Sequence, residues 1–406
     1  METIEPPKTP SRAERSRQIL AVLAKHGFVA AGAGLTGQDG SERAQSQAEQ
    51  ARLACEELGT TFIKLGQILS TRADLLPPEY REELAKLQDN VPPVDTATIE
   101  RIIEEELGDT PANLFARFDG TPLACASIGQ VHAAELADGT AVVVKVRKPE
   151  IRGLIERDIE ILGQLVASSE KHFPDLAGYD LVGMLEEFAD TLRAELDYTR
   201  EARNIEAFAE IFRNDKGIVL PTVVWQYCTS HVLVMTRVAG STIVDLPVMT
   251  AKRSEAASAR VARFILEPAL IQGIFHADPH PGNILIRKDG TIGVLDFGMV
   301  VRIRDDMRRQ ITDVFLAMDQ RDATRLVDRL YQLAPPIRPI DRNALVQRVA
   351  RLLDRYMNAS LERVQIGAVL AEMLEIIRAY GLRPPATLAS LFKAVAISEE
   401  IIMATT

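Results

Sequence analysis

Residues 276–283 read His276-Ala277-Asp278-Pro279-His280-Pro281-Gly282-Asn283, and thirteen residues after Asn283 the chain reads Asp296-Phe297-Gly298. A kinase-type site needs a carboxylate for the acceptor hydroxyl, an amide oxygen five residues later for a metal, and a second carboxylate that bridges Mg²⁺ to the phosphates. Asp278, Asn283 and Asp296 supply these groups in that order. The spacing therefore predicts a phosphoryl-transfer site.

The residues between these two motifs support the same interpretation. Asn283–Ile286 and the β-branched run Thr291–Leu295 flank a turn at Lys288-Asp289-Gly290. Such a pattern predicts a hairpin that presents Asn283 and Asp296 together.

His276 and His280 have the i, i+4 spacing of a helical zinc site. Pro279 and Pro281 forbid the continuous helix that would align the two rings, so we reject the zinc interpretation.

Composition limits the class of protein. The 406 residues are 47% hydrophobic, which is enough for two or three packed structural units. A net charge of −10 argues against nucleic acid as the main partner. Three scattered cysteines indicate a reducing cytosol, and no window has the ~18 to 20 apolar residues of a membrane span. We expect a cytoplasmic protein, soluble or peripheral on the cytoplasmic membrane face, whose natural chain can continue past Thr406.

The first 45 residues are polar and rich in Pro, Ser and Gly around a helical stretch at Gln18–His26, which predicts a flexible arm. Gly32, Gly34 and Gly37 imitate a dinucleotide fingerprint, but helical composition precedes them and a turn follows, so a loop is favoured.

Further along, helical patterns alternate with short strand patterns. Helices are expected over 46–118 with breaks at Pro77 and Pro92, and strands over 130–136 and 140–146 around an Asp138-Gly139 turn. Beyond them we expect helices over 158–171 and 181–212, strands over 217–226, 231–238 and the catalytic hairpin, and helices to the end.

Lys145 lies inside the β-branched run Val142–Val146, where a kinase lysine that holds the α- and β-phosphates is expected. The alternative is a surface lysine on an edge strand, which its position relative to the later motifs disfavours. A glycine-rich loop is missing, and Leu123–His132 stands in its place.

Phe62–Arg72 contains Lys64-Leu65-Gly66-Gln67, and Leu75-Leu76-Pro77 and Leu87–Pro93 follow it. With these motifs the chain resembles the UbiB-like, aarF-domain atypical kinases from about residue 50 to 300. That family carries an alanine-rich loop instead of glycines and the signature KxGQ.

The resemblance implies a gate, in which the KxGQ lysine reaches a carboxylate of an ExD motif and restrains protein-kinase activity. Lys64, Gln67, Glu195 and Asp197 match the gating positions. Glu201 matches the glutamate that orients Lys145, although by sequence alone Glu156 or Glu160 is equally plausible.

The resemblance also implies ATP with Mg²⁺ or Mn²⁺, and a role in isoprenoid quinone or related lipid metabolism. Asp278, Lys145 and Glu201 are the expected catalytic residues, and Asn283 and Asp296 the metal ligands. The other expected ATP-binding residues are Ala124, Cys125, Ala126, Ser127, Ile128, Gly129, Met235 and Val238. After Asp-Phe-Gly the chain passes through Met299–Arg302 into a helix near Asp305, which leaves no room for a long activation loop.

We therefore expect an α+β, two-lobed protein-kinase-like fold. Three functions stay open: an ATPase that presents lipid or quinone-precursor intermediates at a membrane surface, a small-molecule or lipid kinase, and a nucleotide-binding scaffold. The expected domains are a flexible arm (1–45), a helical KxGQ extension (46–119), an N-lobe with the alanine-rich loop (120–240) and a helical C-lobe (241–406).

Overall fold

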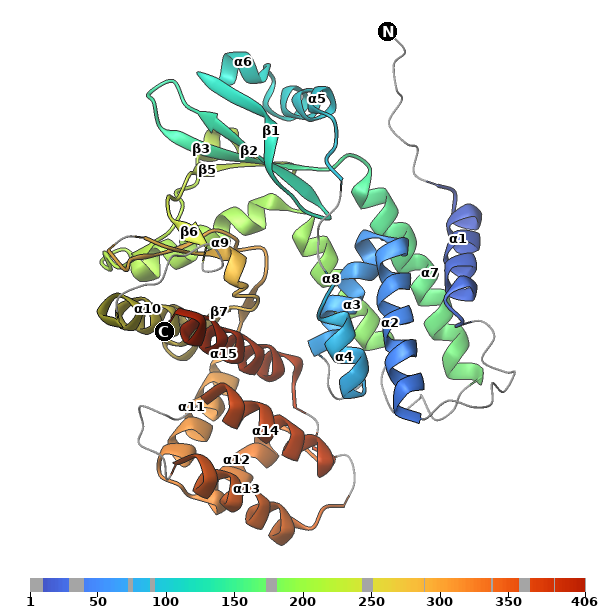
Figure 1. Ribbon diagram of the computed structural model, residues 1–406, viewed down its shortest axis with the longest axis vertical. Helices are drawn as coiled ribbons and strands as arrows, with labels where there is room; N and C mark the ends of the chain where they lie inside the picture. Colours follow the sequence, from blue (N-terminus) through green and yellow to red (C-terminus); the bar gives the residue numbers. More distant parts are fainter. Residues whose placement is uncertain are drawn as a thin grey trace. The chain divides into compact units, whose positions relative to one another are not determined.

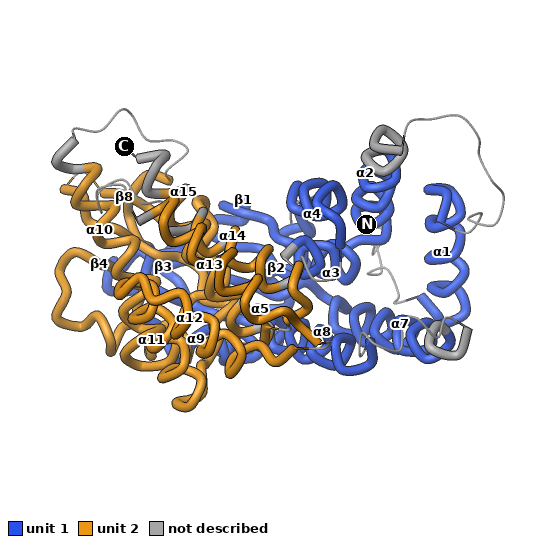
Figure 2. Tube along the Cα trace, turned by 90° about the horizontal axis from the view of Figure 1, so that it is seen from below, with its two compact units in different colours: residues 1–202, 223–237 blue, residues 203–222, 238–406 orange. Residues whose placement is uncertain are grey.

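The computed structural model describes residues 10–28, 40–71, 76–87, 92–172, 181–242, 251–287, 289–336, 339–357, 366–382 and 384–405. The chain forms two compact units, which Figure 2 colours separately. Unit 1 comprises residues 1–202 and 223–237, and unit 2 comprises residues 203–222 and 238–406. Gly32–Gly37, residues 72–75 and residues 88–91, all used in the sequence analysis, lie outside the described residues.

Unit 1 begins with helices whose ends have local causes (Figure 1). Ser11 and Glu14 form a capping box at the start of the first helix, and Asp95 caps the fifth. Gly59 has φ 88°, a left-handed conformation that ends the second helix and allows the third to begin one residue later. These helices are α1 (Arg12–Lys25), α2 (Gly40–Leu58), α3 (Thr60–Thr71), α4 (Pro78–Leu84), α5 (Thr96–Leu107) and α6 (Pro111–Leu114).

The expectation of a flexible arm over residues 1–45 is wrong for α1. Ile19 and Val22 are buried in a cluster with residues of α2 and α3. Arg15 donates from Nε and from a terminal nitrogen to the two carboxylate oxygens of Asp158 at 2.7 and 2.8 Å, and both side chains are buried. Apolar burial and this bidentate pair attach α1 to the rest of unit 1.

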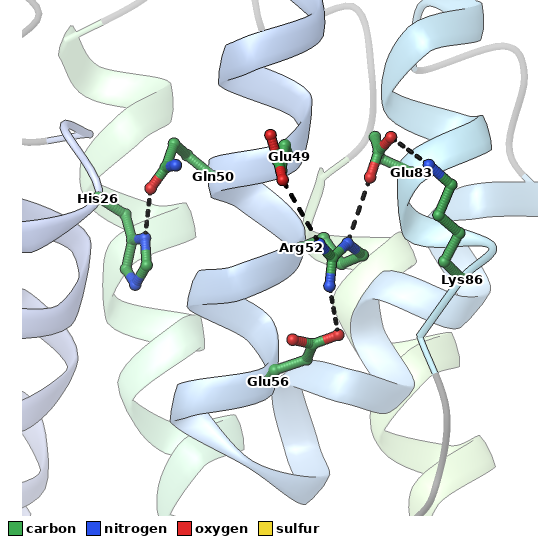
Figure 3. Close-up of polar contacts among 7 residues, drawn as sticks. All are labelled: His26, Glu49, Gln50, Arg52, Glu56, Glu83 and Lys86. Atoms are coloured by element: carbon green, nitrogen blue, oxygen red, sulfur yellow. Dashed lines mark hydrogen bonds and ion pairs between the residues drawn. The ribbon is translucent and has the colours of Figure 1, made fainter.

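A network of charges joins α2 to α4 (Figure 3). Arg52 pairs with Glu83 at 3.2 Å and with Glu56 at 2.7 Å, and Lys86 donates to the same Glu83. The Lys86 and Arg52 donors keep the pKa of the Glu83 carboxyl below its ordinary value. The network holds α4 beside α2 next to the KxGQ helix, which is α3.

Unit 1 also contains an antiparallel sheet, in the order β1-β2-β3-β5. Val142, Val144 and Val146 of β3 are fully buried against α5, so the alternating residue Lys145 projects from the opposite face. The β2–β3 hairpin around Asp138-Gly139 confirms the prediction, with Gly139 at φ 82°. The strands are β1 (Arg117–Cys125), β2 (Gly129–Glu135), β3 (Ala141–Arg147) and β5 (Val232–Thr236).

Two differences from the sequence expectations have identifiable causes. β1 was not expected because it contains Gly120 and Pro122, and register shifts on both sides of Pro122 accommodate them. The predicted strand over 217–226 is wrong beyond β4 (Ile218–Val219): Pro221 follows, and Trp225–Tyr227 is a 3-10 turn.

The helical region after β3 divides into α7 (Ile151–His172), α8 (Leu181–Glu195) and α9 (Tyr198–Phe212). The sequence predicted one helix over 181–212, but the chain breaks at Leu196-Asp197. Asp197 Oδ1 accepts hydrogen bonds from Thr199 N at 3.0 Å and Thr199 Oγ1 at 2.7 Å, so its side chain starts α9 instead of continuing α8. Residues 203–222 group with unit 2, where Phe208 packs on Phe264 with 5.3 Å between ring centroids.

Unit 2 contains the hairpin of residues 284–294 and a helical region. One small sheet has the order β4-β9-β8-β6, and β7 pairs antiparallel with β10. Its strands after β4 are β6 (Ser241–Thr242), β7 (Ile274–His276), β8 (Ile284–Ile286), β9 (Ile292–Val294) and β10 (Val300–Arg302). Its helices are α10 (Ala251–Glu267), α11 (Asp305–Asp319), α12 (Ala323–Leu333), α13 (Arg342–Met357), α14 (Ile366–Ala379) and α15 (Ala386–Thr405). In the described part of the chain every helix is too short or too polar to cross a bilayer.

Candidate active site

Lys145 and Glu201 form a closed ion pair within unit 1. Lys145 Nζ lies 2.9 and 2.7 Å from the two carboxylate oxygens of Glu201, and it also lies 5.1 Å from the centroid of the Tyr198 ring. β3 supplies the lysine and the first turns of α9 supply Glu201 and Tyr198. The alternatives that the sequence left open have other partners, since Glu156 pairs with Arg193 and Glu160 with Arg12.

The alanine-rich segment forms a tight turn between β1 and β2. Ala126 N donates to Gly129 O at 2.8 Å, and Ala124 and Cys125 are the last residues of β1. Ser127 is buried, and its carbonyl accepts a hydrogen bond at 3.2 Å from Thr60 Oγ1, the first residue of α3. Ile128 packs in an apolar cluster that includes Leu65 and Ile68 of α3. The start of the KxGQ helix therefore contacts the turn directly.

A buried polar pair, Gln130 and His132, follows this turn on β2. His132 Nδ1 lies 2.9 Å from Asp119 O, and its Nε2 lies 3.3 Å from Gln130 Nε2. A neutral ring satisfies both contacts when Nδ1 carries the proton and Nε2 accepts from the amide. Burial lowers the pKa of His132 below its ordinary value.

We expect His132 to make the chain less stable in mild acid. An unfolded histidine binds a proton near pH ~6.5, whereas folded His132 binds it only at lower pH, so proton uptake favours unfolding in this interval. The stabilising contribution is complete above about pH 6.5 and is lost as the pH falls below it. The melting temperature should fall between about pH 7.5 and pH 5.5, and it should fall less for His132→Asn than for the wild type. An equal fall in melting temperature in the two proteins would contradict the role of His132.

Two of the four expected gating residues, Lys64 and Glu195, pair with each other. Lys64 Nζ lies 3.2 Å from Glu195 Oε2, and both side chains are mostly buried, at 15% and 11% exposure. Gln67 Nε2 donates to Leu87 O at 3.2 Å, whereas Asp197 contacts Thr199. The structure thus joins Lys64 to the glutamate of the ExD motif, and Asp197 starts α9.

Gly66, between Lys64 and Gln67, lies where α3 approaches Leu84 and Leu87 closely. A Cβ at Gly66 would lie 2.3 Å from Leu87 Cδ1 and 3.2 Å from Leu84 Cδ2. The missing side chain lets α3 pack closely on α4 and on Leu87.

Two of the expected ATP-binding residues, Met235 and Val238, belong to different units. Met235 lies on β5 in unit 1, is buried, and pairs with Val143. Val238 lies in unit 2, where a Cβ at Gly293 would lie 2.6 Å from Val238 Cγ1.

Residues 276–283, the expected catalytic segment, are held by hydrogen bonds within the segment. His280 N donates to Asp278 O at 2.7 Å, Asn283 N donates to His280 O at 2.8 Å, and Gly282 N donates to His280 Nδ1 at 3.1 Å. The segment from Ala277 to His280 is not helical, as Pro279 and Pro281 require. These contacts fix the backbone of Asp278 and Asn283.

His276 joins the catalytic segment to the Asp-Phe-Gly motif. Its Nε2 lies 2.5 Å from Asp296 O, and its Nδ1 accepts from Asp278 N at 3.3 Å. Phe297 is fully buried beside Phe208 and Phe264, with its ring centroid 5.6 Å from that of His276. Asp296 therefore has a backbone anchored on both sides.

Asn283 and Asp296 lie on the expected hairpin. Ile284 pairs with Val294, and Leu295 N donates to Asn283 O at 3.0 Å, so Asn283 adjoins the residue before Asp296. Among the described residues, the Asn283 amide has no side-chain hydrogen-bond partner. Asp296 Oδ1 accepts from Gly298 N at 2.7 Å.

This donor set fits Mg²⁺ or Mn²⁺ when phosphate oxygens complete it. One carboxylate and one amide oxygen are hard ligands, and Mg²⁺ is commonly held by one or two such groups together with substrate phosphates. The described residues contain no cluster of three or more His, Cys, Asp or Glu that could hold a metal.

Sequence reasoning missed Lys393 of α15. Its Nζ lies 3.5 Å from Asp278 Oδ1, with side-chain exposures of 35% and 41%. Nothing in the sequence pattern singled out a lysine 115 residues after Asp278.

Comparison with known proteins gives two family models that match consecutive parts of the chain. The ABC1 atypical kinase-like domain matches residues 86–330, and the UbiB helical domain matches residues 349–402. The first contains Lys145, Glu201, Asp278, Asn283 and Asp296, and the second contains Lys393.

Curated relatives align with most of the chain. An uncharacterised protein of the hydrogenase 1 5′ region of Clostridium pasteurianum is 34% identical. The alignment covers 96% of this chain and 72% of that protein. Protein ACTIVITY OF BC1 COMPLEX KINASE 7, chloroplastic, of Arabidopsis thaliana is 35% identical over 91% of this chain and 53% of its own length. The probable protein kinase UbiB of Aeromonas salmonicida is 34% identical over 83% of this chain and 63% of its own length. The chain thus spans about half to three quarters of these relatives.

A solved structure shares the fold. The complex of Rv3197 with erythromycin from Mycobacterium tuberculosis superposes with a TM-score of 0.63, covers 90% of this chain and 93% of that chain, and is 24% identical. This likeness supports the kinase-like fold.

Proposed function

The chain belongs to the ABC1 atypical kinase-like family, and we propose that it is an ATPase that supports isoprenoid quinone or related lipid metabolism. The observation that carries this proposal is the Lys145–Glu201 ion pair, with 2.7 and 2.9 Å contacts to both carboxylate oxygens. Kinase-type phosphoryl transfer requires such a pair, because it holds the lysine ammonium where the α- and β-phosphates bind. An unrelated surface lysine has no need of a buried glutamate.

The remaining groups divide the work of binding ATP. The turn from Ala124 to Gly129 covers the phosphates, and backbone groups near Met235 and Val238 meet the adenine. Asn283 and Asp296 would hold Mg²⁺ or Mn²⁺, and the ion would supply positive charge against the phosphates. The resemblance of these segments to the family's motifs supports each assignment.

Asp278 orients the attacking water. The water oxygen forms a bond to the γ-phosphorus while the bond from that phosphorus to the β,γ-bridging oxygen breaks, so ADP leaves with the bonding electrons. The water proton passes through Asp278 to the products or to solvent. ATP and water thus yield ADP, inorganic phosphate and a proton.

Two features argue against phosphorylation of protein substrates. Strand β10 begins two residues after Gly298 and α11 begins at Asp305, which leaves no long activation segment for peptide docking. In addition, the ammonium of Lys64 is held by Glu195 at 3.2 Å, in the motif that restrains protein-kinase activity in this family. In this proposal the Lys64–Glu195 pair forms the gate. Gln67 bonds Leu87 O on the α3 side, and Asp197 bonds Thr199 at the start of α9.

A second candidate is a kinase for a small molecule or lipid. The Asp278 side chain is 41% exposed, so a small acceptor hydroxyl can reach it. The same geometry then transfers the γ-phosphoryl group to that hydroxyl in place of water. A nucleotide-binding scaffold ranks last, because every carboxylate needed for catalysis is present. The lipid or quinone-precursor ligand and action at a membrane surface follow from the family and belong to this proposal.

The test is phosphate release from Mg-ATP by the wild type and by Asp278→Asn. It is run with and without anionic liposomes and a phenolic quinone-precursor mimic. We expect turnover to rise with lipid and to fall about 10²- to 10⁴-fold in the variant, the range for loss of a general base. Asp319→Asn, an exposed aspartate of unit 2, is the matched control and should keep full activity.

Each other outcome has a definite meaning. Asp278-dependent loss of ATP without free phosphate, together with a phosphorylated phenol or lipid, would favour the small-molecule kinase. Tight Mg-ATP binding with no turnover would favour the scaffold. Turnover that is equal in the wild type and in Asp278→Asn would contradict the ATPase assignment.

A further inference from the structure

Lys393 contributes a cation to a catalytic segment that has none of its own. Neither residues 276–283 nor residues 292–298 contain Lys or Arg, although they carry the carboxylates of Asp278 and Asp296. Lys393 Nζ lies 3.5 Å from Asp278 Oδ1. Among the described residues, no other side chain pairs with the Asp278 carboxylate.

The packing of α15 fixes the position of this lysine. Its neighbours Leu391, Phe392, Ala394 and Val395 are buried at 0 to 4% exposure, and α15 contacts α10 and α14. Lys393 is the partly exposed position within this buried run. A long side chain on such a helix keeps its ammonium near one place, because the backbone below it cannot shift without exposing the core.

Stability does not explain the pair. Its side chains are 35% and 41% exposed, and exposed ion pairs contribute only about 0 to 1 kcal/mol. The position of the pair at the Asp278 carboxylate suggests a role in positioning that group. Lys393 contacts Oδ1, and no described group pairs with Oδ2, so the ammonium holds one carboxylate oxygen while the other is left for the water or the acceptor hydroxyl.

We propose that Lys393 is a positioning residue that orients the Asp278 carboxylate for phosphoryl transfer. The C-terminal helical region then completes the active site, although the kinase-like domain match ends at residue 330. This inference rests on the proposed ATPase function. It makes Lys393, which lies outside the kinase-like motifs, necessary for full ATPase activity.

The kinetic test compares Lys393→Met, Lys393→Arg and Lys216→Met in the full chain. Lys216 is an exposed lysine of unit 2 and serves as the matched control. We expect Lys393→Met to lower kcat about 10- to 100-fold, the cost of misorienting a reacting group, with the KM for Mg-ATP nearly unchanged. Lys393→Arg should recover most of kcat, and Lys216→Met should match the wild type. A kcat for Lys393→Met equal to that of Lys216→Met would overturn the proposal, as would a rise in KM alone.

A second measurement does not depend on turnover. The rate of modification of Lys393 by an amine-reactive reagent, read by mass spectrometry, is compared between the wild type and Asp278→Ala. Removing the partner should raise this rate about two- to fivefold, as the free energy of an exposed ion pair implies, and leave the rate at Lys216 unchanged. Equal rates at Lys393 would overturn the contact.

If the wild type and Asp278→Asn hydrolyse ATP equally, the ATPase assignment and the role of Lys393 in it both fail. Normal Asp278-dependent turnover in Lys393→Met overturns only the role of Lys393.

Discussion

Asp296→Asn is expected to abolish Mg²⁺-dependent binding of ATP. The substitution removes the carboxylate charge that we assign to the metal but keeps an oxygen at Oδ1, which can still accept from Gly298 N. The backbone of residue 296 should stay in place, because His276 bonds its carbonyl and Phe297 stays buried. Calorimetric titration should show Mg-ATP affinity reduced by about 100-fold or more, beyond the 10- to 100-fold cost of losing only an outer-sphere partner.

The comparison that isolates the metal is ATP binding without a divalent ion. In the absence of metal, Asp296→Asn should bind ATP no more weakly than the wild type, because Lys145 and the turn before β2 are unchanged and the substitution removes a negative charge near the phosphates. Asp319→Asn should bind Mg-ATP like the wild type. Undiminished Mg-ATP affinity in Asp296→Asn would rule out the metal role of Asp296.

Gly129→Ala is expected to cause the largest loss of stability among alanine substitutions at the described glycines of unit 1. A Cβ at Gly129 would lie 2.1 Å from Tyr198 Oη and 2.8 Å from Val146 O. Backbone cannot yield as the end of a flexible side chain can, so the turn must move away from β3. Overpacking of this kind typically costs about 1 to 3 kcal/mol, and thermal melting of the variant should occur several degrees below the wild type.

Gly163→Ala is the matched control, because it makes the same chemical change inside α7. There a Cβ meets only Leu185 Cδ2, at 3.7 Å, an ordinary van der Waals distance. Replacing glycine by alanine within a helix should stabilise by about 0.5 to 1 kcal/mol. The two substitutions should therefore shift the melting temperature in opposite directions. A Gly129→Ala protein that melts with or above the wild type would show that the turn is looser than these contacts imply.

Local patterns predicted much of the fold correctly. The Asp138-Gly139 turn between β-branched runs gave the β2–β3 hairpin, and the 283–295 pattern gave the hairpin that carries Asn283 and leads to Asp296. Both are short-range structures, in which turn residues and alternation lie within about ten positions of each other. β1 escaped prediction because pairing with β2 offsets the local cost of Gly120 and Pro122, and that pairing is invisible in a local window.

α1 shows the same limit for packing. Its sequence is polar, and its buried residues are Arg15, Ile19 and Val22, with Leu23 partly buried against the same cluster. Arg15 finds its carboxylate 143 residues away, at Asp158. No composition rule distinguishes such an arginine from one on a solvated face.

The identity and order of the proposed catalytic and metal-binding groups came from the sequence, since Asp278, Asn283 and Asp296 are separated by short intervals on one hairpin and the loop before it. The ion-pair partners of these and other charged groups could not be predicted from the sequence. Lys145 had three candidate glutamates, and only the start of α9 beside β3 selects Glu201. Likewise, α15 brings Lys393 to Asp278 across 115 residues. Ion pairs depend on distances of a few ångströms between side chains, and those distances are set by how distant elements pack, which local residue patterns do not contain.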